Sequence, residues 1–410
     1  MIGYVWPEPR SSAAGVRDRA LLEIFRAAGH QVVFASTSRR NEHAELLIKE
    51  GVEIAEIAAN DPTFDETVAA IAPDIVIFDR FVYEEQFGWR VRAACPNALR
   101  VLDTQDLHFV RKAREAALRS GQTPEQAFSA WDTPVPSEEC LRELAAIHRS
   151  DLVWVCSQAE KDLLSRRLEV PADKLGVAGF FHAAPPVPGP EFEAREGFVM
   201  IGNFRHAPNA DAVRWLHGDI WSRLRARLPQ AQVRIYGAYP PREMMALTNP
   251  AQGFHVEGPA AGEAADTLAR FRVNLAPLRF GAGIKGKIAE GWRVGTPAVT
   301  TPIGAEGMTA PERPFGGEVE WSADRLAEMA VGLHQSPTRW RQAHERGLAL
   351  VLALYARAPG AAAILGQLDH AVRTRESRRR DLTTSLLWYH GLRSTEYFSR
   401  WIEAKNRPPI

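Results

Sequence analysis

Short apolar runs alternate with amphipathic segments along residues 1–180, and this alternation constrains the fold more than any other feature of the sequence. Residues 74–78 are apolar almost throughout, which is typical of a strand buried on both faces of a parallel sheet. Residues 17–28 carry apolar side chains at helical spacing and end at Gly29, a helix-stop residue. Strands that alternate with helices predict a parallel sheet covered by helices on both faces. The expected strands of this half are 2–6, 31–35, 52–57, 74–78, 99–103 and 151–156, and the expected helices include 17–28 and 46–49.

A proline-rich segment at 183–190 interrupts this alternation. It holds four prolines in eight residues and can form neither a helix nor a central strand, so we predict a stiff linker. The alternation then restarts, and the expected elements are strands at 198–201, 232–236, 254–256, 273–276 and 298–300 and helices at 211–224, 286–292 and 323–334. We therefore expect two Rossmann-like, doubly wound α/β domains, 1–182 and 191–365, that face a shared cleft.

Composition and charge exclude several classes of protein. Charged residues make up 24% and hydrophobic residues 45% of the chain, the balance of a globular protein. Lys plus Arg and Asp plus Glu each number 50, so the basic excess of a protein that coats nucleic acid is missing. Three scattered cysteines are too few for a disulfide framework or a zinc site, so we expect no metal and a reducing, cytoplasmic environment. The apolar start ends at Pro7 and no run reaches about 18 apolar residues, which predicts neither a secretion signal nor a membrane-spanning helix.

The stretch most informative about chemistry is 277–297, directly after an expected strand. Gly281 and Gly283 let the backbone approach a ligand closely, because they lack Cβ atoms. The helix expected to start near Ile284 directs free N–H groups and its positive dipole end at this loop, and Lys285 adds a full charge. These features predict an anion site that suits a diphosphate. The alternative is a tightly turning glycine loop with Lys285 in solvent.

The same stretch also supplies candidates for the remainder of a nucleotide site. Glu290 lies more than one turn into the expected helix, away from its apolar stripe, where a carboxylate suits the two hydroxyls of a ribose. The residues expected to contact a nucleotide here are Gly281, Ala282, Gly283, Ile284 and Glu290.

The loop after the expected strand 198–201 lies at the edge where α/β sheets bind ligands. Arg205 is expected to clamp phosphate oxygens through its guanidinium group, and Asn203 to contact the nucleotide. Asn209 is expected to cap the following helix, 211–224.

Two loops of the first domain face the same cleft in this arrangement. The loop 11–15 is small and flexible, and Gly15 offers a backbone N–H to a phosphate or sugar. After the expected strand 99–103, Asp106 and His108 lie where a reacting group would be met. The alternative for this histidine is an ordinary, hydrogen-bonded loop residue.

The chain ends in a segment of different composition, 366–410. Residues 371–410 hold nine Lys or Arg against four Asp or Glu, with aromatic residues interleaved. One interpretation is a set of closing helices that pack back on the first domain, with Trp388, Tyr389 and Trp401 in a core. The other is a surface for an acidic partner, either phospholipid headgroups, nucleic acid or an anionic glycan. A lipid partner would place the protein peripherally at the inner membrane surface.

The second half of the sequence resembles the donor half of retaining glycosyltransferases of family 4, which have the GT-B fold. The stretches that carry the resemblance are 202–209, 281–290 and 295–307. Residues 150–160 are similar to the end of the acceptor domain of that family, and the resemblance extends over about 1–365. It implies nucleotide-sugar donors, no obligatory metal and retention at the anomeric carbon.

Individual roles carry over only where this sequence matches the family. Glu290 falls on the family's second glutamate, which holds the ribose, and Arg205 and Lys285 resemble the diphosphate clamp. The family's first glutamate, eight residues earlier, contacts the donor sugar; here that position is Ala282, which leaves the hexose open. The loop residues that this resemblance places along the donor site are Thr300, Thr301 and Glu306.

The resemblance therefore implies a metal-independent, retaining hexosyltransferase whose donor is a UDP- or GDP-sugar. Its expected catalytic residues are Arg205, Lys285, Asp106 and His108, the last two on the acceptor side. The resemblance to this family favours a cell-surface glycan or a lipid-linked saccharide as acceptor. A nucleic-acid or protein acceptor remains an alternative. A sugar-nucleotide epimerase, a phosphorylase and a non-catalytic nucleotide-sugar-binding protein are the alternatives on the same fold.

Overall fold

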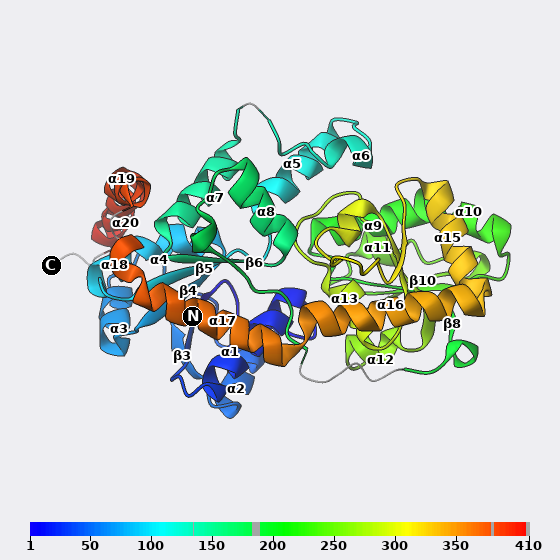
Figure 1. Ribbon diagram of the computed structural model, residues 1–410, viewed down its shortest axis with the longest axis horizontal. Helices are drawn as coiled ribbons and strands as arrows, with labels where there is room; N and C mark the ends of the chain where they lie inside the picture. The colour runs from blue at the N-terminus through cyan, green and yellow to red at the C-terminus, as the bar shows by residue number, and fades with distance from the viewer. Residues whose placement is uncertain (134, 183–188, 379–380, 407–410) are drawn as a thin grey trace.

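The computed structural model describes residues 1–133, 135–182, 189–378 and 381–406, and the chain forms two α/β lobes side by side along its long axis (Figure 1). Most of the predicted linker at 183–190 lies outside the described residues. Each lobe contains one sheet, and every strand pair is parallel. The predicted fold class, two parallel α/β sheets in a two-domain arrangement, is confirmed.

The first lobe has a seven-stranded sheet in the order β3-β2-β1-β4-β5-β6-β7. Its strands are β1 (Ile2–Gly3), β2 (Val33–Ser36), β3 (Glu53–Glu56), β4 (Ile75–Asp79), β5 (Leu99–Asp103), β6 (Leu152–Val155) and β7 (Leu175–Val177). Its helices are α1 (Ala13–Ala27), α2 (Glu42–Lys49), α3 (Thr63–Ile71), α4 (Phe81–Ala94), α5 (His108–Arg119), α6 (Pro124–Ala127), α7 (Glu138–Arg149) and α8 (Gln158–Arg167). Successive residues of β4 enter different cores, since Phe78 packs with α3 and α4 while Ile77 packs with α1. Helices therefore cover both faces.

The second lobe has a six-stranded sheet in the order β10-β9-β8-β11-β12-β13. Its strands are β8 (Glu196–Ile201), β9 (Val233–Tyr236), β10 (Phe254–Gly258), β11 (Phe271–Ala276), β12 (Ala298–Thr300) and β13 (Gly317–Val319). Its helices are α9 (Ala207–Trp215), α10 (Trp221–Arg227), α11 (Arg242–Met245), α12 (Ala264–Leu268), α13 (Gly286–Arg293), α14 (Pro302–Ala305), α15 (Ala323–Gln335) and α16 (Pro337–Tyr355). Val273 of β11 packs with α10 and α15, whereas Ala276 of the same strand packs with α13 and α16. This sheet, too, is covered on both faces.

The chain crosses between the lobes at two places that lie beside one another. His182 N donates to Tyr355 O at 2.8 Å, and Arg357 N donates to His182 O at 3.1 Å. Beyond this point α17 (Arg357–Arg373) runs along the first lobe, where Ile364 joins the core of α1 and β6 (Figure 1). Residues 357–365, which the sequence assigned to the second domain, therefore lie against the first lobe.

The C-terminal helices α18 (Arg375–Arg378), α19 (Leu382–His390) and α20 (Arg393–Asn406) also lie on the first lobe, where α19 contacts α7 and α20 contacts α4. Trp388 Nε1 donates to Arg149 O at 3.1 Å, and the indole is buried. Tyr389 and Trp401 are exposed. Of these three aromatic residues, Trp388 alone belongs to a core.

The first strand is shorter than the predicted strand 2–6 and ends at Gly3. The Tyr4 N–H donates to Asp79 Oδ2 at 3.2 Å and so leaves the hydrogen-bond ladder between strands. An apolar run predicts a strand here, but a buried carboxylate at the end of β4 ends it by offering the backbone a stronger acceptor.

The helix predicted at 211–224 begins earlier, at Ala207. Pro208 fits the first turn, because the N–H groups of that turn have no partner within the helix. Asn209 consequently lies inside the helix, and its predicted capping role is wrong. Its side chain instead donates to Asn203 O at 2.9 Å.

Candidate functional site

The loops that follow β11 and β5 meet between the two lobes. Gly283, in the first of these loops, has φ +67°, and a Cβ atom added to it would lie 2.9 Å from Asp106 Cβ in the second. Only a glycine permits this approach, both for its backbone conformation and for the space available. The ligand-binding edges of the two sheets therefore face each other across a close interface.

The N-terminus of α13 points at this interface. A Cβ atom on its first residue, Gly286, would lie 2.7 Å from Ala13 Cβ, at the start of α1. Lys285 is the N-cap residue, and no side chain among the described residues caps the helix. The first N–H groups of α13 thus lack partners within the helix, and its dipole adds partial positive charge. We call residues 281–287 the cradle, because such a loop and helix end bind anions.

Two lysines add full charges to the cradle. Lys285 is 8% exposed, and its Nζ donates to Gly283 O. Burial lowers the pKa of Lys285, although Glu306 acts in the opposite direction. Lys287 Nζ donates to Asn209 Oδ1, and burial together with the nearby Lys285 charge lowers the pKa of Lys287 to about 7. Both amines donate to uncharged oxygens. A negatively charged phosphate would form stronger hydrogen bonds with them than these oxygens do.

Arg205 lies at the rim of this region, on the loop after β8. Its guanidinium carbon stands 3.7 Å from the centre of the Tyr239 ring, and Tyr239 Oη donates to Glu8 Oε2 of the first lobe at 3.0 Å. Asn203 Oδ1 accepts from Arg205 N at 2.8 Å and fixes the turn. The Arg205 side chain is exposed, and no carboxylate of the described residues pairs with it. Arg205 is therefore free to meet an anionic ligand.

Asp106 and His108 stand on the first-lobe side of the interface. His108 Nε2 lies 3.2 Å from Asp106 Oδ1, and Arg111 Nε donates to Asp106 Oδ2 at 2.7 Å. Burial acts to raise the pKa of Asp106, but Arg111 and His108 outweigh it and hold that pKa well below its usual range. Asp106 is therefore ionised at neutral pH. It can accept a hydrogen bond from a hydroxyl, but it is a weak base.

Arg114 of α5 links the lobes and was missed by the sequence analysis. Its two terminal nitrogens donate to both carboxylate oxygens of Glu306 at 2.7 and 2.8 Å, and Nη1 also donates to Gly281 O at 2.7 Å. Arg114 is 1% exposed. One side chain of the first lobe thus holds both the cradle and the loop after β12, and Glu306, predicted to line the donor site, is its partner.

Replacing Arg114 with methionine is expected to favour a more open arrangement of the lobes. A bidentate charged contact of this kind stabilises the closed arrangement by about 1.5–3 kcal/mol. We expect a larger radius of gyration in small-angle X-ray scattering. Arg119→Met, on the same helix but 76% exposed, is the matched control and should leave the scattering unchanged. An Arg114→Met curve that superimposes on that of the wild type would show that the contact does not set the lobe arrangement.

Glu290 and Thr301 already have partners in this structure. Glu290 Oε2 accepts from Arg293 Nη2 at 3.0 Å, and Glu290 Oε1 lies 3.5 Å from His182 Nδ1, at the crossing between the lobes. Thr301 is fully buried and caps α14, where its hydroxyl accepts from Gly304 N at 3.2 Å. Glu290 therefore lies beside the crossing between the lobes, and Thr301 lies beneath the surface.

Gly15, Ala282 and Ile284 bring the backbone close to neighbouring elements. Gly15 N donates to Ser12 Oγ at 3.0 Å, so this N–H is engaged in capping α1. Ala282 packs against the core of the first lobe, and Ile284 against the core of α13 and α16. The nucleotide contacts assigned to these residues stay predictions.

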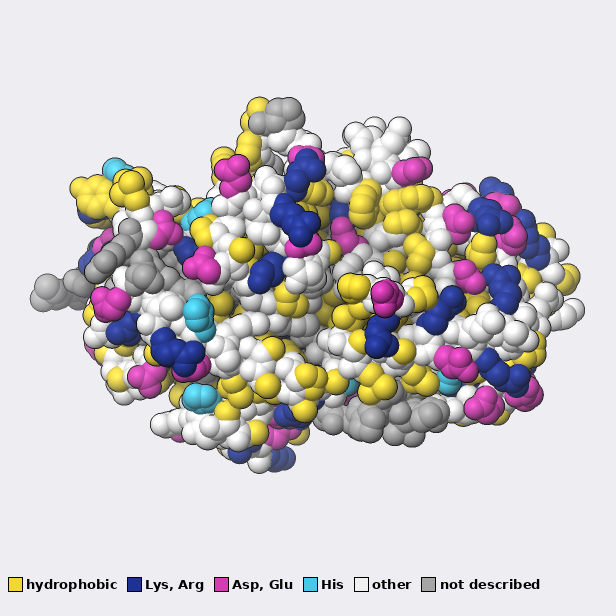
Figure 2. Space-filling view, viewed as in Figure 1, with side chains coloured by type: hydrophobic (Ala, Val, Ile, Leu, Met, Phe, Trp, Pro, Cys, Tyr) yellow, Lys and Arg dark blue, Asp and Glu magenta, His cyan; other side chains and the backbone are white. Residues whose placement is uncertain are grey.

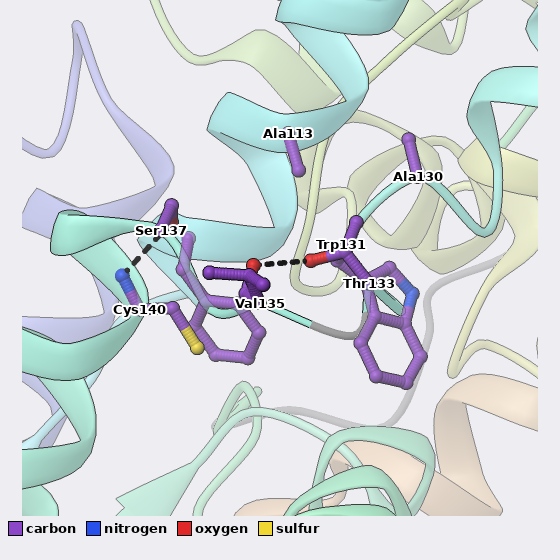
Figure 3. Close-up of a pocket in the computed structure, with 8 residues that line it drawn as sticks. Ala113, Ala130, Trp131, Thr133, Val135, Ser137 and Cys140 are labelled. Carbon is purple, nitrogen blue, oxygen red and sulfur yellow. Dashed lines mark hydrogen bonds between the residues drawn. The ribbon is translucent and has the colours of Figure 1, made fainter.

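A separate pocket of about 420 Å³ lies on the first lobe between α5, α7 and the segment that joins α6 to α7 (Figure 3). Its lining consists of Phe109, Ala113, Ala130, Trp131, Thr133, Val135, Ser137 and Cys140. The two hydroxyl groups are engaged locally, since Thr133 Oγ1 donates to Val135 O at 2.8 Å and Ser137 Oγ accepts from Cys140 N at 3.2 Å (Figure 3). No lining residue is charged, so this pocket suits an apolar group and not a diphosphate.

Comparison with known proteins bears on the second lobe and on the fold. Residues 195–331 match the family model described as glycosyl transferases group 1. This range contains the loop after β8, the cradle and the loop after β12. No curated protein sequence matches the chain.

Several solved structures share the two-lobed fold. Sucrose-phosphate synthase from Thermosynechococcus elongatus has a TM-score of 0.66 at 17% identity and covers 91% of this chain and 98% of its own. The Anabaena protein HepE, solved with UDP, gives 0.67 at 10% identity over 90% and 98% of the two chains. A glycosyltransferase from Rickettsia africae gives 0.62 at 13% identity over 88% and 96%. These likenesses show that the chain has a GT-B-like fold, and within it residues 195–331, about a third of the chain, match the model of the group 1 glycosyl transferases.

Proposed function

We propose that this protein is a glycosyltransferase that moves a hexose from a UDP- or GDP-sugar to an acceptor hydroxyl, with retention of anomeric configuration and without a metal. The observation that supports this most is the cradle, whose glycines, free helix end and buried Lys285 face Asp106 of the other lobe. A cationic site where two domains meet suits a diphosphate whose sugar projects towards the acceptor side. The Anabaena protein HepE was solved with UDP-glucose, which makes that compound the first donor to test.

The cradle supports departure of the nucleoside diphosphate. As the bond from the anomeric carbon to the phosphate oxygen breaks, negative charge builds on the leaving group. Lys285, Lys287 and Arg205, with the first N–H groups of α13, are preorganised donors for this charge in a largely closed interface. In this proposal the two lysines exchange their present oxygen partners for phosphate oxygens.

The low pKa of Asp106 favours a particular route for the proton of the acceptor. Asp106 accepts a hydrogen bond from the acceptor hydroxyl and orients it, but does not take its proton. The hydroxyl oxygen forms the new bond to the anomeric carbon, and its proton passes to the departing phosphate oxygen. Attack and departure on one face of the sugar give retention. His108, next to Asp106, holds that carboxylate in place.

A cell-surface glycan or a lipid-linked saccharide is the acceptor class we propose. The uncharged pocket in Figure 3 is lined by Phe109 and Ala113 of α5, the helix whose first residue is His108. An apolar group carried by an acceptor would therefore have a pocket on the same helix that presents the acceptor-side polar residues.

Release of nucleoside diphosphate tests the proposal. The enzyme is incubated with UDP-glucose or GDP-mannose, with and without lipid-linked and free oligosaccharides. A transferase releases UDP or GDP only when an acceptor is present. Interconversion of donor sugars without acceptor would identify an epimerase, and release only with inorganic phosphate a phosphorylase. Donor binding without turnover over a broad acceptor set would identify a non-catalytic binding protein.

Affinity for UDP is expected to fall as the pH rises above about 7, because an amine with that pKa loses its charge. A bound diphosphate favours the charged form of Lys287 and raises its pKa, so binding takes up a proton. Calorimetry at pH 8 in buffers of different ionisation enthalpy should show uptake approaching one proton, and Lys287→Met should abolish it. Absence of uptake by the wild type would contradict a contact between Lys287 and the diphosphate.

A further inference from the structure

Exposed apolar side chains gather on the last two helices, at one end of the first lobe (Figure 2). We call this set the outer face; it consists of Leu382, Leu386, Tyr389, Tyr397, Phe398 and Trp401, each more than half exposed. Monomeric proteins rarely leave such a patch in water unless it binds something.

The helices that carry the outer face are firmly docked by their other sides. Trp388 of α19 is buried and donates from Nε1 to Arg149 O at 3.1 Å. Arg90 of α4, itself 1% exposed, donates to Ser399 Oγ of α20 at 3.1 Å and to the Glu403 carboxylate. These contacts fix the buried sides of α19 and α20 against the first lobe, so the outer face is turned towards solvent.

Two further exposed apolar residues lie on or next to α7 of the same lobe. Leu141 is exposed on α7, the helix that α19 packs against. Val135, in the segment before α7, is 79% exposed and lines the apolar pocket. In Figure 1 this segment lies at the top of the first lobe, and α7 lies between it and the helices α19 and α20 at the left end. Exposed apolar side chains therefore also occur on the first lobe outside the outer face.

Cations accompany the aromatic rings of the outer face. The Arg393 guanidinium carbon lies 5.1 Å from the centre of the Tyr389 ring, and Lys405 Nζ lies 5.2 Å from that of Trp401. Glu403 points inward to Arg90, so its charge does not offset these cations on the outside. Aromatic rings beside Lys and Arg, together with exposed leucines, form the composition that partitions to the headgroup region of a bilayer.

We propose that the outer face docks the enzyme on an anionic lipid surface. Acidic headgroups would meet Arg393 and Lys405, while the leucines and rings enter the boundary below. The attachment that we propose is interfacial. No helix of the described chain is long and apolar enough to cross a bilayer. This inference goes beyond the proposed transfer reaction and does not depend on it.

Two other occupants fit this face less well. Nucleic acid would leave Leu382 and Leu386 without a role. The rings of Phe398 and Trp401 stack on one another, with centroids 5.9 Å apart and an interplanar angle of 22°, so these two ring faces do not receive bases. A second copy of the chain packed about a two-fold axis would bring like cations of the two copies together.

Vesicle flotation of the full chain tests the proposal. We expect binding to phosphatidylcholine vesicles that contain phosphatidylglycerol, weak binding to pure phosphatidylcholine, and loss of binding at high salt. Phe398→Ser combined with Trp401→Ser should weaken binding about tenfold or more, because these rings supply much of the inserted apolar area. Arg393→Glu combined with Lys405→Glu should weaken it as well. The matched control is Leu352→Ser on α16, which removes an apolar side chain that is 51% exposed on the second lobe and should change nothing.

All the altered side chains are exposed, so we expect the variants to fold. Thermal unfolding verifies this. The proposal is overturned if the wild type ignores phosphatidylglycerol vesicles, or if the Phe398/Trp401 variant binds them like the wild type. Binding of single-stranded RNA in place of vesicles, lost in that variant, would identify a nucleic-acid surface instead. A wild-type dimer in light scattering that the same variant converts to a monomer, without vesicle binding, would identify a second copy as the occupant.

Discussion

Replacement of Lys285 by alanine is expected to weaken UDP binding about ten- to a hundredfold, the effect of losing a charged hydrogen bond of about 1.5–3 kcal/mol. Lys285 is buried beside the carbonyl groups of the glycine loop, with its Nζ 3.3 Å from Ala282 O. Solvent screens a charge in such a place poorly, so its attraction for a diphosphate is large. The dissociation constant of UDP, measured by isothermal titration calorimetry, reports the effect directly and needs no knowledge of the acceptor.

Lys112→Ala is the matched control for this experiment. Lys112 lies on α5 of the other lobe, half exposed, with its Nζ 3.8 Å from Glu115 Oε2. Its loss should change the UDP affinity by less than about twofold, because exposed ion pairs contribute little. If Lys285→Ala binds UDP as tightly as Lys112→Ala does, the diphosphate lies elsewhere.

Replacement of Arg149 by methionine is expected to lower the free energy of unfolding of the first lobe by about 3–5 kcal/mol, since it leaves a buried carboxylate without its partner. Arg149 of α7 and Glu84 of α4 are 2% and 1% exposed, and Arg149 Nε lies 3.0 Å from Glu84 Oε1. The same arginine offers its backbone carbonyl to Trp388 of the C-terminal helices. Urea unfolding followed by circular dichroism measures the loss.

The pH dependence of the Arg149→Met effect gives a second readout. Burial already raises the pKa of Glu84, and removal of Arg149 raises it further. A carboxyl whose pKa is higher in the folded than in the unfolded state takes up a proton on folding. The destabilisation is therefore largest at neutral pH and shrinks as the pH falls towards about 5.

A second ion pair between the same two helices supplies the control. Arg142 of α7 donates to Glu85 of α4 at 2.6 Å, but its side chain is 45% exposed. Arg142→Met should change the free energy of unfolding by less than about 1 kcal/mol. Glu84→Gln added to Arg149→Met should recover part of the loss, because it removes the unpaired charge. Equal effects of Arg149→Met and Arg142→Met would contradict the role assigned to burial.

The central strands of both sheets are predictable from the sequence. The predicted strands 99–103 and 298–300 coincide with β5 and β12. A strand buried on both faces must be apolar almost throughout, and such a run stands out in the sequence. The edge strands β7 and β13 were not predicted, since a glycine or a glutamate interrupts each of them and neither is a continuous apolar run.

The parts of the candidate site that sequence analysis found are those that are contiguous along the chain. A strand, a glycine loop and a helix start put Gly281, Gly283 and Lys285 together whatever the tertiary structure. Lys287 belongs to the same stretch, and its spacing two residues after Lys285 was the signal that could have identified it.

The contacts between lobes could not be predicted in this way. Arg114 meets Glu306 from 192 residues away, and nothing in α5 distinguishes it from the exposed Arg119 on the same helix. Tyr239 likewise reaches Glu8 only because the lobes come together. Such pairs depend on the arrangement of the two domains, which local patterns do not encode.

Hydrogen–deuterium exchange with and without UDP tests most directly the claim that the cradle holds the diphosphate. The account predicts slower exchange in residues 281–288, where the free N–H groups of α13 gain an acceptor, and in the loop 202–206 that carries Arg205. It predicts no change in residues 128–140, which border the uncharged pocket. Protection confined to 128–140, with the cradle unaffected, would contradict it.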